Sequence, residues 1–80
     1  MNANLENLDP EELFIFKWQY RLLGDFGHAL IKAILEADDH NLAKLRIGFP
    51  VEVGGYIKYA REPEWWKKVQ KKALGDQSKD

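Results

Sequence analysis

Cysteine and threonine are absent from this sequence of 80 residues, and its only serine is Ser78, close to the end. Without cysteine the chain has no disulfide, no thiolate nucleophile and no cysteine-based zinc site. Covalent catalysis by a serine, threonine or cysteine nucleophile would depend on Ser78 alone. The glycines also lack the spacing of phosphate-binding loops. We therefore expect a protein that is not an enzyme and holds no cofactor.

Long apolar runs are missing as well. The longest, Leu13 to Phe16, has four residues, whereas a membrane-spanning helix needs roughly 20. The polar, acidic start lacks the layout of a signal peptide, in which a charged stretch precedes an apolar one. These features predict a soluble, cytoplasmic protein without a membrane partner.

The formal net charge of −1 conceals an uneven distribution. Residues 1–40 carry three basic and eight acidic side chains, whereas residues 41–80 carry nine basic and five acidic ones. Such a dipole can orient a charged partner or attract a second copy of the chain. It is also compatible with ordinary solvated helix faces.

The first clear structural signal is a helix start at Asp9, Pro10 and Glu12. Aspartate can accept hydrogen bonds from free amide groups, proline suits the first helical position, and Glu12 completes a reciprocal capping pattern. We expect a helix over residues 10–23, with Gly24 as its left-handed stop.

A second helix is expected over residues 26–37, with Asp25 as its cap. The short connection predicts that the first two helices form an antiparallel hairpin. Asp38 or Asp39 is then expected to cap a third, short helix that ends at Gly48.

The segment 51–59 has two interpretations, a helix or a small hairpin. Its adjacent glycines cost a helix about 1 kcal/mol each relative to alanine, and a Gly-Gly pair is also a hairpin turn signal. An isolated two-stranded hairpin is marginal in water, so we favour the helix. A last helix is expected to begin near Glu62 or Pro63 and to end at Gly75.

Together these signals predict an all-α fold, a compact bundle of four to five short helices in one domain over residues 1–80. The ordered core is expected at about residues 9–74, with flexible ends at 1–8 and 76–80. The hairpin of the first two helices is expected to form the base, with the others packed across it. The residues expected to be mostly buried are Leu13, Phe16, Trp18, Tyr20, Leu23, Leu30, Ile34, Leu42, Leu45, Phe49, Val53, Ile57, Trp66 and Val69, with Ile47 as a further inward candidate.

One pattern in the second half consists of the run LAKLRIGFP at residues 42–50, Tyr56, Tyr59 and the pair Trp65 and Trp66. This pattern resembles short, mostly uncharacterised helical proteins that bacteriophages and other mobile elements of bacteria encode. The similarity covers about residues 12–70 and departs from the pattern at Gly54 and Gly55. It implies a small helical protein of a phage-like element inside a bacterial host cell, and it assigns no activity and no functional residue.

Ten aromatic residues are many for so small a core, and adjacent tryptophans cannot both face inward on one helix. Because exposed aromatic groups are enriched at interface centres, we favour protein binding, with modulation of a host or element protein as its purpose by analogy. A second copy is a further candidate partner. The alternative is nucleic-acid binding by the basic last helix. The candidate interaction surface consists of Trp65, Trp66, Tyr56, Tyr59, Lys67, Lys68, Lys71 and Lys72.

The sequence offers one further candidate site, for a metal ion. The only histidines are His28 and His40, and His40 follows Asp38 and Asp39. These aspartates stand at an expected helix start, where capping explains them. Since the histidines also lack the spacing of known zinc motifs, we predict no metal site.

Overall fold

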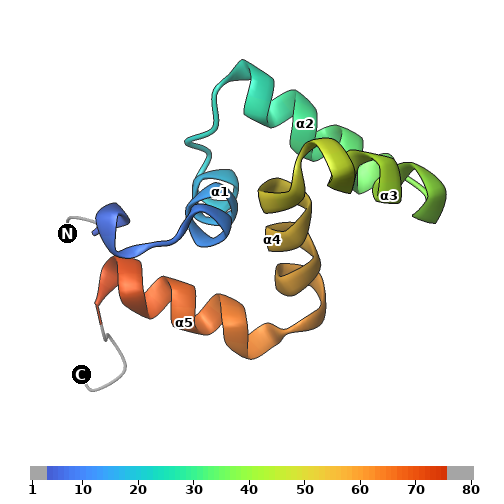
Figure 1. Cartoon of the computed structure of the whole chain (residues 1–80). Helices are drawn as coiled ribbons and strands as arrows, with labels where there is room; N and C mark the ends of the chain where they lie inside the picture. Colours follow the sequence, from blue (N-terminus) through green and yellow to red (C-terminus); the bar gives the residue numbers. More distant parts are fainter. Residues whose placement is uncertain (1–3, 76–80) are drawn as a thin grey trace.

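The computed structural model describes residues 4–75, and all the regular structure in this range is helical (Figure 1). A 3-10 helix, η1 (Leu5–Asn7), precedes five α-helices, which are α1 (Pro10–Gln19), α2 (Asp25–Glu36), α3 (Asp39–Gly48), α4 (Pro50–Arg61) and α5 (Pro63–Leu74). The predicted all-α fold class is confirmed. Within residues 4–75, no helix combines the length and the apolar character that crossing a membrane requires.

Helix α4 is the centre of the fold, because it contacts each of the other four α-helices. Figure 1 shows α1 beside α4, with α5 on one side and the α2–α3 pair on the other. The prediction that α1 and α2 form the basal hairpin is wrong. Helix α1 packs on α4 and α5, while α2 crosses the far end of the molecule and packs on α4.

The turn after α1 explains why α2 leaves in another direction. Arg21 has a left-handed backbone with a φ of 59°. The amide of Leu22 donates to the carbonyl of Lys17 at 2.7 Å, and the amide of Arg21 donates to that of Trp18 at 3.2 Å. These two hydrogen bonds are the Schellman motif of a helix end. The left-handed residue that ends α1 is therefore Arg21 instead of Gly24, and α1 is shorter than predicted. The connection to α2 is correspondingly longer, so α2 does not have to pack antiparallel to α1.

The segment 51–59 is helical as part of α4, so the favoured interpretation is confirmed and the hairpin is wrong. Gly54 and Gly55 lie where α4 meets α1. A Cβ atom on Gly55 would stand 2.9 Å from the carbonyl oxygen of Glu11 and 3.1 Å from Cγ1 of Ile15, and one on Gly54 would meet the carboxylate of Glu11. The glycines thus permit a close approach of two helices, which offsets their low helix propensity.

Side chains cap two of the helix starts as predicted. At α1, the amide of Glu12 donates to the Asp9 carboxylate at 2.8 Å, and the amide of Asp9 donates to the Glu12 carboxylate at 2.9 Å. At α3, Asp38 accepts from a first-turn amide at 2.8 Å. The expected cap of α2 is wrong: Gly24 holds the cap position, and Asp25 is the first helical residue, where its charge favours the helix dipole.

Two apolar clusters hold the helices together. The first joins α1 to α5 and contains Leu8, Phe16, Val69 and Ala73, and the second joins α2 to α4 and contains Leu30, Ile31, Ile34 and Val53. Of the predicted core, Phe16, Leu30, Ile34, Val53 and Val69 are buried, and Leu13, Trp18, Leu23, Leu42, Leu45, Phe49, Ile57 and Trp66 are half-buried. Tyr20 is exposed, contrary to the prediction, because it follows the last turn of α1 and stacks on Phe16 from outside, with ring centroids 4.3 Å apart.

The residues before α1 are packed, where a frayed arm was expected. The amide of Asn4 donates to the carbonyl of Ala73 at 2.6 Å. Leu8 is buried against Phe16 and Val69. Residues 4–8 therefore contact α1 and α5, while residues 1–3 and the predicted tail at 76–80 lie outside the described residues.

Candidate functional site

The aromatic part of the predicted surface belongs to a connected cluster between α1, α4 and α5. The Tyr59 ring lies 5.2 Å from that of Trp18 and 5.6 Å from that of Trp66, centroid to centroid. Tyr56 lies 6.4 Å from Trp18, and Trp66 lies 6.5 Å from Phe16. Edge and tilted contacts of this kind stabilise a fold beyond the area they bury. Tyr56, Tyr59 and Trp66 are thus half-buried structural residues.

Trp65 and Trp66 have similar surroundings, and neither is a fully buried residue beside a fully exposed one. Both are half-buried, and both pack against the cluster of α1 and α5. Adjacent tryptophans on one helix were not expected to face inward together, yet both pack against this cluster, and neither is fully buried. Their contribution to an interface is limited to the edges that remain in solvent.

The four lysines of α5 differ in their surroundings. Lys72 donates to the carboxylate of Glu12 at 2.7 Å, and Glu12 is only 4% exposed. This hydrogen bond raises the pKa of the Lys72 ammonium group. Lys67 pairs loosely, at 3.7 Å, with the glutamate three residues before it. Lys68 and Lys71 are exposed, so the basic surface that remains for a partner is smaller than the sequence indicates.

A further ion pair joins α4 to α1 beside the glycines. Lys58 donates to the carboxylate of Glu11 at 2.6 Å. The hydrogen bond and the charge of Glu11 raise the pKa of Lys58. This lysine, which could have extended the basic surface, is therefore also engaged with a carboxylate.

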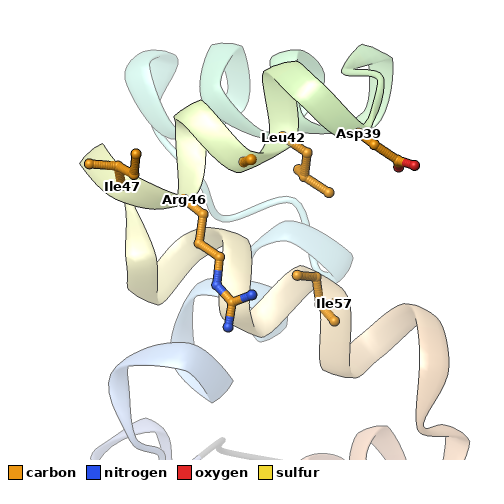
Figure 2. A pocket seen from close by; sticks show the side chains of 6 residues that line it. Asp39, Leu42, Arg46, Ile47 and Ile57 are labelled. Atoms are coloured by element: carbon orange, nitrogen blue, oxygen red, sulfur yellow. The ribbon is translucent and has the colours of Figure 1, made fainter.

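A shallow groove of about 300 Å³ between α3 and α4 is the surface that the sequence did not reveal (Figure 2). Leu42 and Ile57 give it apolar walls, and the Arg46 side chain extends from α3 toward α4 beside Ile57. Asp39 lies at the other end of α3 from Ile47. The groove therefore combines an apolar centre with one cationic and one anionic side chain.

Ile47 is the most exposed large apolar side chain of this region, at 84%. It was an inward candidate, and that prediction is wrong. Leu42 and Leu45 pack against the cluster of α2 and α4, and a step of two residues from Leu45 turns a helix by about 200°. Ile47 consequently points away from that core and lines the groove edge. The sequence could have shown this, because Ile47 does not share the helix face of Leu42 and Leu45.

A second exposed apolar group was also missed. Phe26, in the first turn of α2, is 68% exposed. Its ring lies 5.8 Å from that of Phe49, in the corner between α3 and α4. Phe49, the residue between α3 and α4, thus contacts an aromatic side chain of α2.

Of the two aspartates before His40, Asp38 caps α3, as one of the two was predicted to do, and Asp39 is the first residue of that helix. Among residues 4–75, no three histidine, aspartate, glutamate or cysteine side chains gather in a way that could hold a metal ion. No protein-family model, no curated protein and no solved structure matches this chain.

Proposed function

We propose that this chain is a small, non-enzymatic protein-binding module whose binding face is the groove between α3 and α4. The observation that carries the proposal is Ile47, which is 84% exposed at the edge of an apolar groove. Burying such a side chain on a partner contributes about 1.5–3 kcal/mol. Arg46 in the same groove is of a residue type enriched at interface centres.

The resemblance to phage and mobile-element proteins supports modulation of a host or element protein as the purpose of this binding. Such a role needs one face that recognises a partner and no catalytic group.

Ile47→Lys tests the binding face. The position is open to solvent, so the variant is expected to fold like the wild type and to lose its partner. Leu35→Lys is the matched control, because Leu35 is also an exposed apolar residue, at 51%, but lies on α2. Tagged wild type, Ile47→Lys and Leu35→Lys are used to capture proteins from a bacterial lysate. If Leu35→Lys still captures the partner and Ile47→Lys does not, the groove is supported as the binding face. If all three proteins capture it equally, the groove is not the binding face.

Nucleic-acid binding by α5 is the second candidate, supported by two exposed lysines, Lys68 and Lys71, one turn apart. It is the weaker proposal because Lys58 and Lys72 are paired with glutamates. A labelled duplex and a labelled single strand, titrated in about 50 mM salt where the electrostatic contribution is strong, provide the test. Binding that Lys68→Glu abolishes would favour this function, and no binding would exclude it.

A further inference from the structure

The turn between α1 and α2 holds one residue in an unfavourable backbone conformation. Arg21 has a φ of 59° and is the only non-glycine residue with a positive φ among residues 4–75. Glycine adopts this left-handed conformation readily, whereas a residue with a Cβ atom is strained in it. Strained residues concentrate at ligand sites, where the surrounding structure holds them in place. The Arg21 side chain is therefore a candidate for a role in binding.

A hollow of about 410 Å³ lies beside this turn, and Arg21 is one of the residues that line it. The others are Trp18 of α1, Leu23 of the connection and His28 in the first turn of α2. The hollow is more enclosed than the groove between α3 and α4, and the two share no lining residue. Its volume is within the range of small-molecule binding sites.

The lining residues of this hollow are of two kinds. Trp18 and Leu23 are half-buried and pack against the cluster of α2 and α4, so they form an apolar wall that the core holds in place. Arg21 and His28 are exposed, and neither side chain forms an ion pair or a hydrogen bond with another residue of the range 4–75. No acidic side chain of the described residues lines the hollow. The guanidinium charge of Arg21 is therefore available to a ligand.

We propose that this hollow binds a small carboxylate with an apolar body, either a free organic acid or the last residue of a peptide. The planar guanidinium group of Arg21 matches a carboxylate with two parallel hydrogen bonds. A neutral imidazole such as that of His28 has one N–H to donate to an oxygen. The apolar body would cover Trp18 and Leu23 in place of water. The lining holds one permanent cation, which fits the single charge of a carboxylate better than the double charge of a phosphate group.

Three probes separate the contributions of the charge and of the apolar body. N-acetyl-phenylalanine carries both a carboxylate and a ring, its amide keeps the ring without the charge, and acetate keeps the charge without the ring. In two-dimensional NMR of the purified chain, N-acetyl-phenylalanine should shift the indole signal of Trp18 and the amide signals of Arg21 and His28, with a Kd of about 0.1–1 mM. The indole signal of Trp65, on α5, is the internal reference and should stay in place. The amide and acetate should bind at least about tenfold more weakly.

Phenylacetate distinguishes the two sources of the ligand, because it is a free acid without the acetamido group of a chain end. Tighter binding of phenylacetate than of N-acetyl-phenylalanine supports the hollow as a site for a free acid. The opposite order supports it as a site for a peptide terminus.

Arg21→Gly tests the strained residue, because stability and binding should change in opposite directions. Glycine relieves the strain, so the variant should unfold at a higher urea concentration than the wild type, while its Kd for N-acetyl-phenylalanine rises at least about tenfold. Arg21→Gln keeps a long side chain, removes the charge and should weaken binding as well. Arg61→Gln is the matched control, since Arg61 is exposed at the end of α4 and its loss changes the net charge equally. This control should bind like the wild type.

The histidines provide a second matched pair. His28→Ala should weaken binding, whereas His40→Ala, at an exposed position in the first turn of α3, should not. The absence of a saturable shift up to about 10 mM N-acetyl-phenylalanine would overturn the inference. Equal binding of the amide, or unchanged binding by Arg21→Gly and Arg21→Gln, would also overturn it. Shifts confined to the residues of the groove between α3 and α4 would exclude the hollow as the site.

Discussion

Replacing Gly55 with alanine is expected to destabilise this protein, although alanine is the better helix former by about 1 kcal/mol. The added Cβ would stand 2.9 Å from the carbonyl oxygen of Glu11 and 3.1 Å from Cγ1 of Ile15. Neither atom is the free end of an exposed side chain, because one is backbone and Ile15 is fully buried. Helix α1 would have to move away from α4. Overpacking costs about 1–3 kcal/mol, and we place this site at the upper end, for a net loss of about 1–2 kcal/mol.

Two other glycines provide matched controls for the same substitution. Gly48, the last residue of α3, has open space around its Cβ direction, so Gly48→Ala should stabilise the protein by up to about 1 kcal/mol. Gly54 faces only the carboxylate of Glu11, which can rotate away at the expense of its pairing with Lys58. Gly54→Ala should therefore be close to neutral.

Thermal unfolding followed by circular dichroism measures the order of stability. A change of 1 kcal/mol shifts the Tm of a domain of this size by about 4–8 °C. The expected order is Gly48→Ala above the wild type, Gly54→Ala near it, and Gly55→Ala below it. If Gly55→Ala were as stable as Gly48→Ala, the close approach of α1 and α4 would not exist, and the account of the central helix would fail.

The remaining predictions concern an ion pair, a turn and a buried residue. The pKa of Lys72 is raised above 10.5 in the folded protein by Glu12, so the stabilisation by this pair is complete below that pH and lost as the pH rises through the higher folded value. The stability difference between wild type and Lys72→Met should accordingly be constant near neutral pH and shrink above about pH 10.5. Arg21→Gly should raise stability by about 1 kcal/mol, because a left-handed non-glycine residue costs about 1–2 kcal/mol, and urea unfolding would show a higher midpoint. Leu8→Ala should lower the free energy of unfolding by about 2–4 kcal/mol, whereas a frayed arm would give no change in the same assay.

The helix boundaries were largely predictable because their signals are local. Asp9 and Glu12 form the expected capping box, and Asp38 caps α3. Gly75 ends α5 with a positive φ of 82°. Each of these signals depends on side chains within a few residues of a helix end, so the sequence carries them almost completely.

The packing was less predictable because it depends on residues far apart in the chain. Helix α1 ends at a left-handed Arg21 instead of at Gly24, so the direction in which α2 leaves differs from the predicted one and the expected hairpin does not form. Gly54 and Gly55 weaken a helix considered alone, and only the approach of Glu11, more than 40 residues earlier, gives them a purpose. The groove was missed for a related reason, since its walls, Leu42 and Ile57, come from two helices and were both assigned to the core.

Ile47→Lys is the prediction that separates a binding residue from a folding residue. Single exposed apolar side chains are common on protein surfaces, so an exposure of 84% does not by itself indicate a function. If Ile47 serves only an interface, lysine at this position should change the stability of the monomer by no more than about 0.5 kcal/mol, because the side chain removes little apolar area from water within its own chain. Urea unfolding at low protein concentration measures this change without a contribution from any association between molecules. A loss of about 2 kcal/mol, the size expected for a buried isoleucine, would mean that Ile47 supports the fold, and the groove between α3 and α4 would lose the residue on which its proposed binding role depends.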